Sequence, residues 1–170
     1  MQSATTLSAS STAGATNIKV ASVPDFAAGQ TILIDSGASL ETAIIATVGT
    51  AGATTVGTAT NVGATVIPVA SGAGFTAGQT ITIDSGANQE TAVVAATTFG
   101  GRGGGRGGPG AGATITVAAP LTLAHAAGAQ VSGSGITLTA PLTRAHAGGA
   151  PVASGVPTPG APNRYYRKTN

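Results

Sequence analysis

Four of the five acidic residues form two equivalent pairs that could bind a cation. Asp35 and Glu41 make the first pair, and Asp84 and Glu90 make the second. Carboxylate oxygens are ligands of Ca²⁺, but a calcium ion takes about six to eight oxygens, more than one pair supplies. We therefore expect these side chains to serve hairpin turns and strand ends, with cation binding as the alternative, and we predict no metal site.

The chain has two histidines, His125 and His146, each inside a copy of the pattern Pro-Leu-Thr-x-Ala-His-Ala. Imidazole could transfer protons or bind a metal, but no carboxylate or second ligand lies near either ring in the sequence. The absence of cysteine excludes disulfides and thiolate metal sites. The pattern predicts packed histidines whose rings hydrogen-bond to loop backbone.

Serine and threonine are abundant, but the chain has no Gly-x-Ser-x-Gly motif leading into a helix, the arrangement of a nucleophile elbow. Residues 103–108 match Gly-x-Gly-x-x-Gly only because that stretch is almost entirely glycine, and no strand-loop-helix context surrounds them. We therefore predict that the protein is not an enzyme and has no catalytic residue, no cofactor and no cofactor-binding residue.

The basic residues are few and give a formal net charge of +2. Arg102 and Arg106 lie in a glycine run at 100–110, and arginine-glycine segments can bind RNA. Two arginines do not make a dense basic patch. We interpret the run as a flexible insertion and expect no nucleic-acid partner.

The C-terminal end concentrates basic and aromatic side chains, the kinds that anchor protein interfaces. We interpret it as a candidate subunit interface or surface-polymer contact, with a solvated tail as the alternative. Its residues are Arg164, Tyr165, Tyr166, Arg167 and Lys168.

Two internal repeats indicate the units that must position these residues. The segment Ala-Gly-Gln-Thr-Ile-x-Ile-Asp-Ser-Gly-Ala at 28–38 recurs at 77–87, an offset of 49 residues. A second echo, which contains the histidines, relates 115–129 to 136–150 with an offset of 21 residues. Both echoes are too regular for chance in an alanine- and glycine-rich chain, although the shorter one could be a local duplication within a single unit.

The repeats have the pattern of β-strands. Thr80–Asp84 and Thr114–Val117 alternate polar and β-branched apolar residues, which predicts strands with one buried face. Asp-Ser-Gly-Ala at 35–38 and 84–87 predicts a hairpin turn, because Asp can bond the backbone ahead and Gly allows positive φ. The Leu-Thr-x-Ala-His-Ala stretches are expected to form one helical turn each.

These observations predict an all-β fold of two tandem small strand-hairpin modules, sandwich-like or barrel-like, with extended termini. No run approaches the roughly 20 apolar residues of a membrane span. The N-terminus lacks the pattern of a signal peptide, so we expect a leader to be absent or already removed. The expected ranges are an N-terminal arm at 1–13, modules at 14–62 and 63–152, the insertion at 100–110 and a tail at 153–170.

The repeated Ala-Gly-Gln-Thr-Ile-x-Ile-Asp-Ser-Gly-Ala and Pro-Leu-Thr-x-Ala-His-Ala patterns resemble small β modules found beside catalytic domains in secreted bacterial and fungal proteins. They are also similar to short strand units of phage virion proteins. The resemblance covers most of residues 14–152. It implies an extracellular or assembly setting and carries no catalytic or binding residue.

The composition leads to a hypothesis of self-association. Charged residues make up 7% and aromatic residues 3% of the chain, so the cores are expected to be thin and the strand edges poorly protected. We expect a structural homopolymer, an extracellular or cell-surface filament, coat or matrix joined by strand addition, with the arm at 2–13 pairing with a neighbour. The alternatives are a phage virion structural protein, a spacer or carbohydrate-binding module of a secreted enzyme that contacts a surface polysaccharide, and an ice-binding surface.

Overall fold

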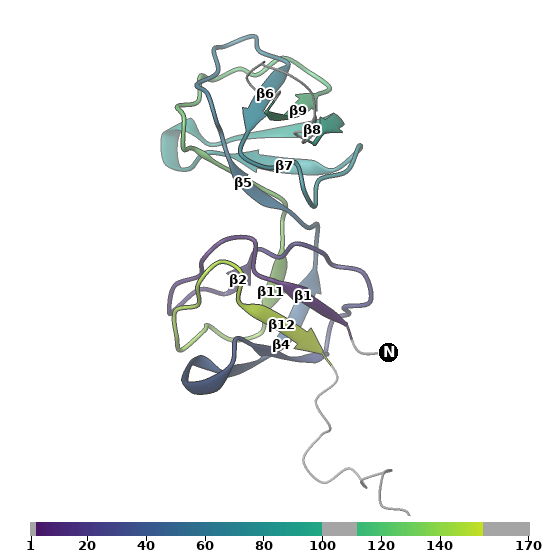
Figure 1. Ribbon diagram of the computed structural model, residues 1–170, viewed down its shortest axis with the longest axis vertical. Coiled ribbons are helices and arrows are strands. Elements are labelled where there is room, and N and C mark those ends of the chain that lie inside the picture. The colour runs from purple at the N-terminus through teal and green to yellow at the C-terminus, as the bar shows by residue number, and fades with distance from the viewer. Residues whose placement is uncertain (1–2, 100–111, 155–170) are drawn as a thin grey trace, which may run out of the picture.

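The computed structural model describes residues 3–99 and 112–154, and these residues form an all-β fold with no α-helix. The strands belong to two six-stranded sheets in which neighbouring strands are antiparallel. Each sheet curls into a module of its own, and the two modules lie one above the other along the long axis (Figure 1). The predicted class, an all-β protein of two small modules, is confirmed.

The first module combines strands from the two ends of the described chain. Its strand order is β1-β12-β3-β4-β11-β2. The strands are β1 (Ala4–Thr6), β2 (Asn17–Ile18), β3 (Thr31–Ile34), β4 (Glu41–Val48), β11 (Ile136–Leu138) and β12 (Pro151–Ser154).

The second module lies wholly between β4 and β11 in the chain, so it is inserted into the first. Its strand order is β5-β10-β7-β8-β9-β6. The strands are β5 (Ala53–Thr55), β6 (Val66–Val69), β7 (Thr80–Ile83), β8 (Glu90–Thr98), β9 (Ala113–Val117) and β10 (Gln130–Ser132). The strand pairing thus divides the chain differently from the ranges 14–62 and 63–152 that the repeats suggested.

The two modules have the same strand order once equivalent strands are matched. Strands β1 to β4 correspond to β5 to β8, whereas β11 and β12 correspond to β9 and β10. Both sequence offsets therefore arise from one six-stranded unit that occurs twice, with one copy nested inside the other. The repeat also extends to the first strands, because Ala-Thr-Thr-Leu at 4–7 matches Ala-Thr-Thr-Val at 53–56.

Backbone hydrogen bonds close each sheet on itself. In the first module Ser8 N–H donates to the Lys19 carbonyl at 2.9 Å, and Ala21 N–H donates to the Thr6 carbonyl at 3.0 Å, which joins β1 to β2. Equivalent bonds of the second module run from Gly57 to Pro68 and from Ala70 to Thr55. The outer strands of both sheets therefore pair with each other, and β1, expected to be part of an extended arm, is built into its own module.

Alternation along the strands builds a separate core in each module. In β3 and β7 the isoleucines point inward and are 0% exposed, while the first threonine of each strand points outward. β-branched residues suit such half-buried strands. The first core contains Leu7, Ile18, Val20, Ile32, Ile34, Ile45, Ile136 and Val152, and the second contains Val56, Ile67, Phe75, Ile81, Ile83, Val94, Ile115 and Val131.

The predicted hairpin turns are confirmed. Asp35 adopts φ of 70°, its Oδ1 accepts a 2.8 Å hydrogen bond from Ser36 N–H, and a one-turn 3₁₀ helix, η1 (Gly37–Ser39), leads into β4. The turn after Asp84 repeats this geometry with η2 (Gly86–Asn88). The helical turn predicted for the histidine stretches is wrong: these stretches are bends in which each histidine forms an isolated β-bridge.

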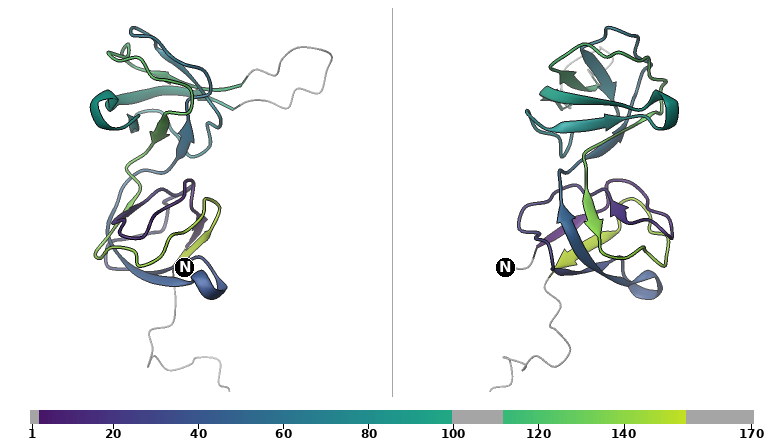
Figure 2. Two further views of the ribbon diagram at one scale, coloured as in Figure 1. Left: turned by 90° about the vertical axis from the view of Figure 1, so that its left-hand side faces the viewer. Right: turned by 180° about the vertical axis from the view of Figure 1, so that it is seen from behind.

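Two chain segments connect the modules, and we call residues 49–52 and 133–135 the neck (Figure 2). Gly49 N–H donates to the Gly135 carbonyl at 2.8 Å, and Gly133 N–H donates to the Gly52 carbonyl at 2.9 Å. Thr50 and Ser134 exchange hydrogen bonds between each backbone N–H and the other hydroxyl, at 2.9 and 3.0 Å. The neck is therefore a cross-bonded ribbon, stiffer than a single linker.

Close packing explains the glycines of the neck. A Cβ on Gly133 would collide with the carbonyl oxygens of Thr50 and Ala51. Lys19 reaches this point from the first module and donates from Nζ to the Gly133 carbonyl at 2.8 Å, and burial lowers the pKa of this amine. From the second module, Gln79 Nε2 donates to the Ala51 carbonyl at 2.7 Å. Asn17 Nδ2, also in the first module, donates to the Ser134 carbonyl at 2.8 Å, so both modules hold the neck with polar side chains.

Candidate functional site

The second module buries a histidine between two carboxylates. His125 Nδ1 lies 3.4 Å from Asp84 Oδ2, and Nε2 lies 3.2 Å from Glu90 Oε2. The histidine is 1% exposed, whereas 21% of the Asp84 side chain and 11% of the Glu90 side chain are exposed. We call this Asp-His-Glu arrangement the histidine clamp.

The first module contains the same clamp at the equivalent positions. His146 Nδ1 lies 3.2 Å from Asp35 Oδ2, and Nε2 lies 3.0 Å from Glu41 Oε2. The acidic pairs and the histidines, which lie far apart in the sequence, therefore form one kind of site. The predicted bond from each ring to loop backbone is wrong, because both ring nitrogens face carboxylates. It is the main chain of His146 that exchanges hydrogen bonds with Ser11.

Three structural elements place the clamp residues. The aspartate directly follows β3 or β7 and takes positive φ at the start of the turn. The glutamate begins β4 or β8 directly across the hairpin, paired with the last isoleucine of the preceding strand. The histidine arrives from the loop before β12 or β10. The hairpin thus presents two carboxylates a few residues apart, and the ring fits between them.

The glutamate also holds the start of the histidine loop. Glu41 Oε1 accepts hydrogen bonds from Thr143 N–H at 2.6 Å and from its hydroxyl at 2.9 Å, and Oε2 accepts one from Arg144 N–H at 3.1 Å. Glu90 accepts the same three bonds from Thr122 and Leu123, at 2.7, 2.8 and 3.0 Å. Each glutamate therefore joins the hairpin to a loop that is distant in the sequence.

These contacts favour the ionised form of three of the clamp carboxylates, those of Asp35, Glu41 and Glu90. Burial alone would raise the pKa of Glu41, but hydrogen bonds from Thr143, His146 and Arg144 outweigh it and lower the pKa to about 2. The same balance, with donors on Thr122, Leu123 and His125, lowers the pKa of Glu90. Hydrogen bonds from His146 and Ser36 lower the pKa of Asp35. A carboxylate that accepts several hydrogen bonds favours its charged form.

The clamp suits internal bonding better than reaction with a substrate. Both nitrogens of each ring lie within hydrogen-bond distance of a carboxylate oxygen, so the polar atoms of the ring have partners inside the fold. A hydrogen bond to an ionised carboxylate is stronger than a bond between neutral groups. With the rings of His125 and His146 at most 2% exposed and both nitrogens occupied, no ring atom faces solvent where a substrate could approach.

Cation binding by the acidic pairs finds no support in the clamp geometry. The two carboxylates of each pair face opposite nitrogens of the histidine ring and do not converge on a common point. Across residues 3–99 and 112–154, no group of three or more His, Cys, Asp or Glu side chains is placed to hold a metal ion.

The remaining residues singled out from the sequence lie outside the described ranges. They are the arginines of the glycine-rich insertion, Arg102 and Arg106, and the C-terminal candidate interface, Arg164, Tyr165, Tyr166, Arg167 and Lys168.

The signal that could have revealed the clamp was the recurrence of Asp, Glu and His at the same two offsets as the repeats.

The fold and the site together define an all-β protein of two nested, closed six-stranded modules, each locked by a buried histidine clamp. No family model, curated protein or solved structure matches this chain. Within the described part of the chain, no helix has the length and apolar character needed to cross a bilayer.

Proposed function

We propose that the protein is a non-enzymatic structural protein that associates with copies of itself in an extracellular or virion assembly. The observation that carries this proposal is a pair of equivalent surface hollows, one on each module. Each hollow lies between a hairpin and the loop that follows β11 or β9, and their volumes are about 340 and 300 Å³. We call them the paired hollows.

The paired hollows keep the same exposed residue types in both modules. The first is lined by Thr31, Thr42, Ile44, Ala140 and Pro141, and the second by Thr80, Thr91, Val93, Ala119 and Pro120. Ile44 is 47% exposed and Val93 is 44% exposed. Some exposed positions elsewhere have diverged, since Leu40 corresponds to Gln89 and Arg144 to Leu123. Two equivalent apolar contact surfaces on one body suit repeated contacts between subunits.

The neck and the clamps support a structural role. The cross-bonded neck limits movement between the modules, so the two hollows keep a defined spacing. Four of the five acidic side chains and both histidines are used in the clamps. Most acidic and histidine side chains of the described residues therefore make contacts that stabilise the fold.

Closure of the sheets changes the expected mode of association. Strand addition requires unpaired backbone groups at a sheet edge. In the described residues the outer strands of each sheet are joined to each other, and β1 pairs with β12. We therefore propose that subunits join through side-chain contacts at the paired hollows, with no exchange of strands.

Light scattering after size exclusion, followed by electron microscopy, tests this proposal. We expect the wild-type protein to form assemblies at high concentration, and the double variant Ile44→Ser with Val93→Ser to remain monomeric. The matched control is Leu40→Gln, which removes another exposed apolar side chain and places the residue of the second module at that position. A wild-type protein that stays monomeric at all concentrations contradicts the proposal.

A further inference from the structure

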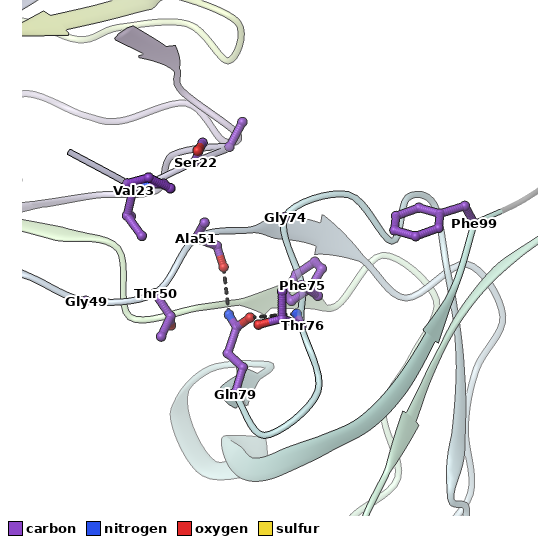
Figure 3. A pocket seen from close by; sticks show the side chains of 12 residues that line it. Ser22, Val23, Gly49, Thr50, Ala51, Gly74, Phe75, Thr76, Gln79 and Phe99 are labelled. Atoms are coloured by element: carbon purple, nitrogen blue, oxygen red, sulfur yellow. Dashed lines mark hydrogen bonds between the residues drawn. The ribbon is translucent and has the colours of Figure 1, made fainter. Parts of the chain in front are cut away.

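A cleft between the two modules is not used by the clamps or by the paired hollows. It has a volume of about 420 Å³, within the range of roughly 300 to 1,000 Å³ typical of small-molecule sites. Its walls come from the loop after β2 in the first module, from the neck, and from the loop after β6 together with Phe99, which follows β8, in the second (Figure 3). A ligand bound there would contact both modules at once.

The cleft contains the one exposed phenylalanine. Phe26 and Phe75 are 8% and 3% exposed, whereas Phe99 is 66% exposed and lies at the rim of the cleft (Figure 3). Leaving a phenylalanine ring in water gives up the burial that would otherwise stabilise the fold. A flat apolar ring beside a cleft is suited to stack on a flat apolar face of a ligand.

The rest of the lining combines small and apolar side chains with a few uncharged polar ones. The hydroxyls of Ser22, Thr50 and Thr76 lie around the cleft, and Gln79 lies at its base (Figure 3). Gly74 exposes backbone at this wall, and a Cβ there would press on the Ala21 carbonyl oxygen at 3.0 Å. Among the residues that the structure describes, no Asp, Glu, Lys, Arg or His side chain lines the cleft. The described walls therefore offer no compensating charge to an anionic or a cationic ligand.

We propose that this cleft binds a neutral saccharide, with Phe99 stacking on the sugar ring and the hydroxyls of Ser22 and Thr76 bonding to sugar hydroxyls. A pyranose has an apolar face of C–H groups and a rim of hydroxyls, which matches an aromatic ring next to uncharged hydrogen-bonding groups. This inference goes beyond the proposed assembly role and does not depend on it, because a single chain contains the whole cleft.

The test is an NMR titration of the full-length, ¹⁵N-labelled protein with three neutral disaccharides: maltose, cellobiose and N,N′-diacetylchitobiose. We expect at least one sugar to shift the backbone amide signals of Ser22, Thr50 and Thr76. Phe99→Ala should weaken that binding about tenfold, the size expected for loss of one stacking ring. Leu40→Ala is the control, because it shortens an exposed side chain that does not line the cleft.

Three results would overturn the proposal. The first is that none of the three sugars shifts a cleft signal at millimolar concentration. The second is that Phe99→Ala binds sugar as well as the wild type does. The third is that Phe99→Ala changes the oligomeric state of the protein and leaves sugar binding unchanged. That result would assign the cleft to contact with a second copy of the chain. Thermal unfolding of Phe99→Ala checks that the variant is folded.

Discussion

The two modules build the same clamp from parts of the chain that lie at very different separations. In the second module, His125 is 35 residues from Glu90. In the first, His146 is 105 residues from Glu41, because the whole second module intervenes. The clamp geometry is nevertheless closely similar, so the strand order determines the site and the length of the connection does not.

The long connection has a smaller entropic cost than its length suggests. Tripling the length of a flexible loop costs about 1 kcal/mol of closure entropy. Once the second module has folded, the bonds of the neck bring Gly52 and Gly133 together. The effective loop between β4 and β11 is then short, and its closure costs little entropy. The second module should therefore fold first and help the first module to close.

The largest expected effect comes from separating the modules. A fragment of residues 51–134 contains every strand of the second module, so we expect it to fold alone. A fragment of residues 3–50 lacks β11 and β12 and should remain unfolded, because two of its six strands and its histidine are missing. Circular dichroism and amide NMR spectra measure this. A folded 3–50 fragment would contradict the nested assignment.

Removing a histidine from either clamp should have the next largest effect. His146→Ala leaves a cavity and removes the hydrogen bonds between the buried ring and two carboxylates, a loss of the kind that costs up to about 3 kcal/mol. We expect His146→Ala to destabilise the first module only, and His125→Ala to destabilise both, since the first depends on the second. Hydrogen exchange measured module by module separates these outcomes.

Arg144→Leu is the matched control for the clamp variants, because the second module carries Leu123 at the equivalent position. The Arg144 side chain is exposed and bonds to the Ala38 carbonyl, whereas its backbone N–H serves Glu41 and is kept in the variant. We expect a change within about 0.5 kcal/mol, as for most surface substitutions. If His125→Ala and His146→Ala change hydrogen exchange in the two modules in the same way, the expected order of folding is contradicted.

The smallest expected effect is the loss of stability in acid, which tests the contribution of the clamp carboxylates. A carboxylate whose pKa is lower in the folded state stabilises the fold above its unfolded pKa, and this contribution is lost as the pH falls through the folded pKa. For Glu41 the window runs from about 4.5 down to about 2. Urea midpoints should be constant above this window and fall within it, and Glu41→Gln should flatten the fall. A midpoint that rises with acid would contradict the clamp.

Much of the local structure could be predicted from the sequence. The alternation in Thr80–Ile83 and the Asp-Ser-Gly-Ala turns identify strands and hairpins because these signals act over a few residues. The 49-residue offset identifies a repeated unit. Recognition of the first repeated strand failed because Ala-Thr-Thr-Leu is inconspicuous in a chain so rich in alanine and threonine.

The nesting and the clamp could not be read from local patterns. The 21-residue echo marks the last two strands of each unit, but which earlier strands they join depends on pairing across the whole chain. Likewise Asp35 and His146 are 111 residues apart, so nothing near either residue indicates the contact. The distance between partners, more than the residue types, limited the prediction of the site.

The nested arrangement has a mechanical consequence. Because Ala4 pairs with Ala153, the chain enters and leaves the described structure on neighbouring strands of the first module. A pulling force applied through the flanking segments would first unzip β1 from β12, hydrogen bond by hydrogen bond. The second module hangs outside this load path and would bear no tension until the first had opened, so it could keep a bound partner in place while its neighbour yields.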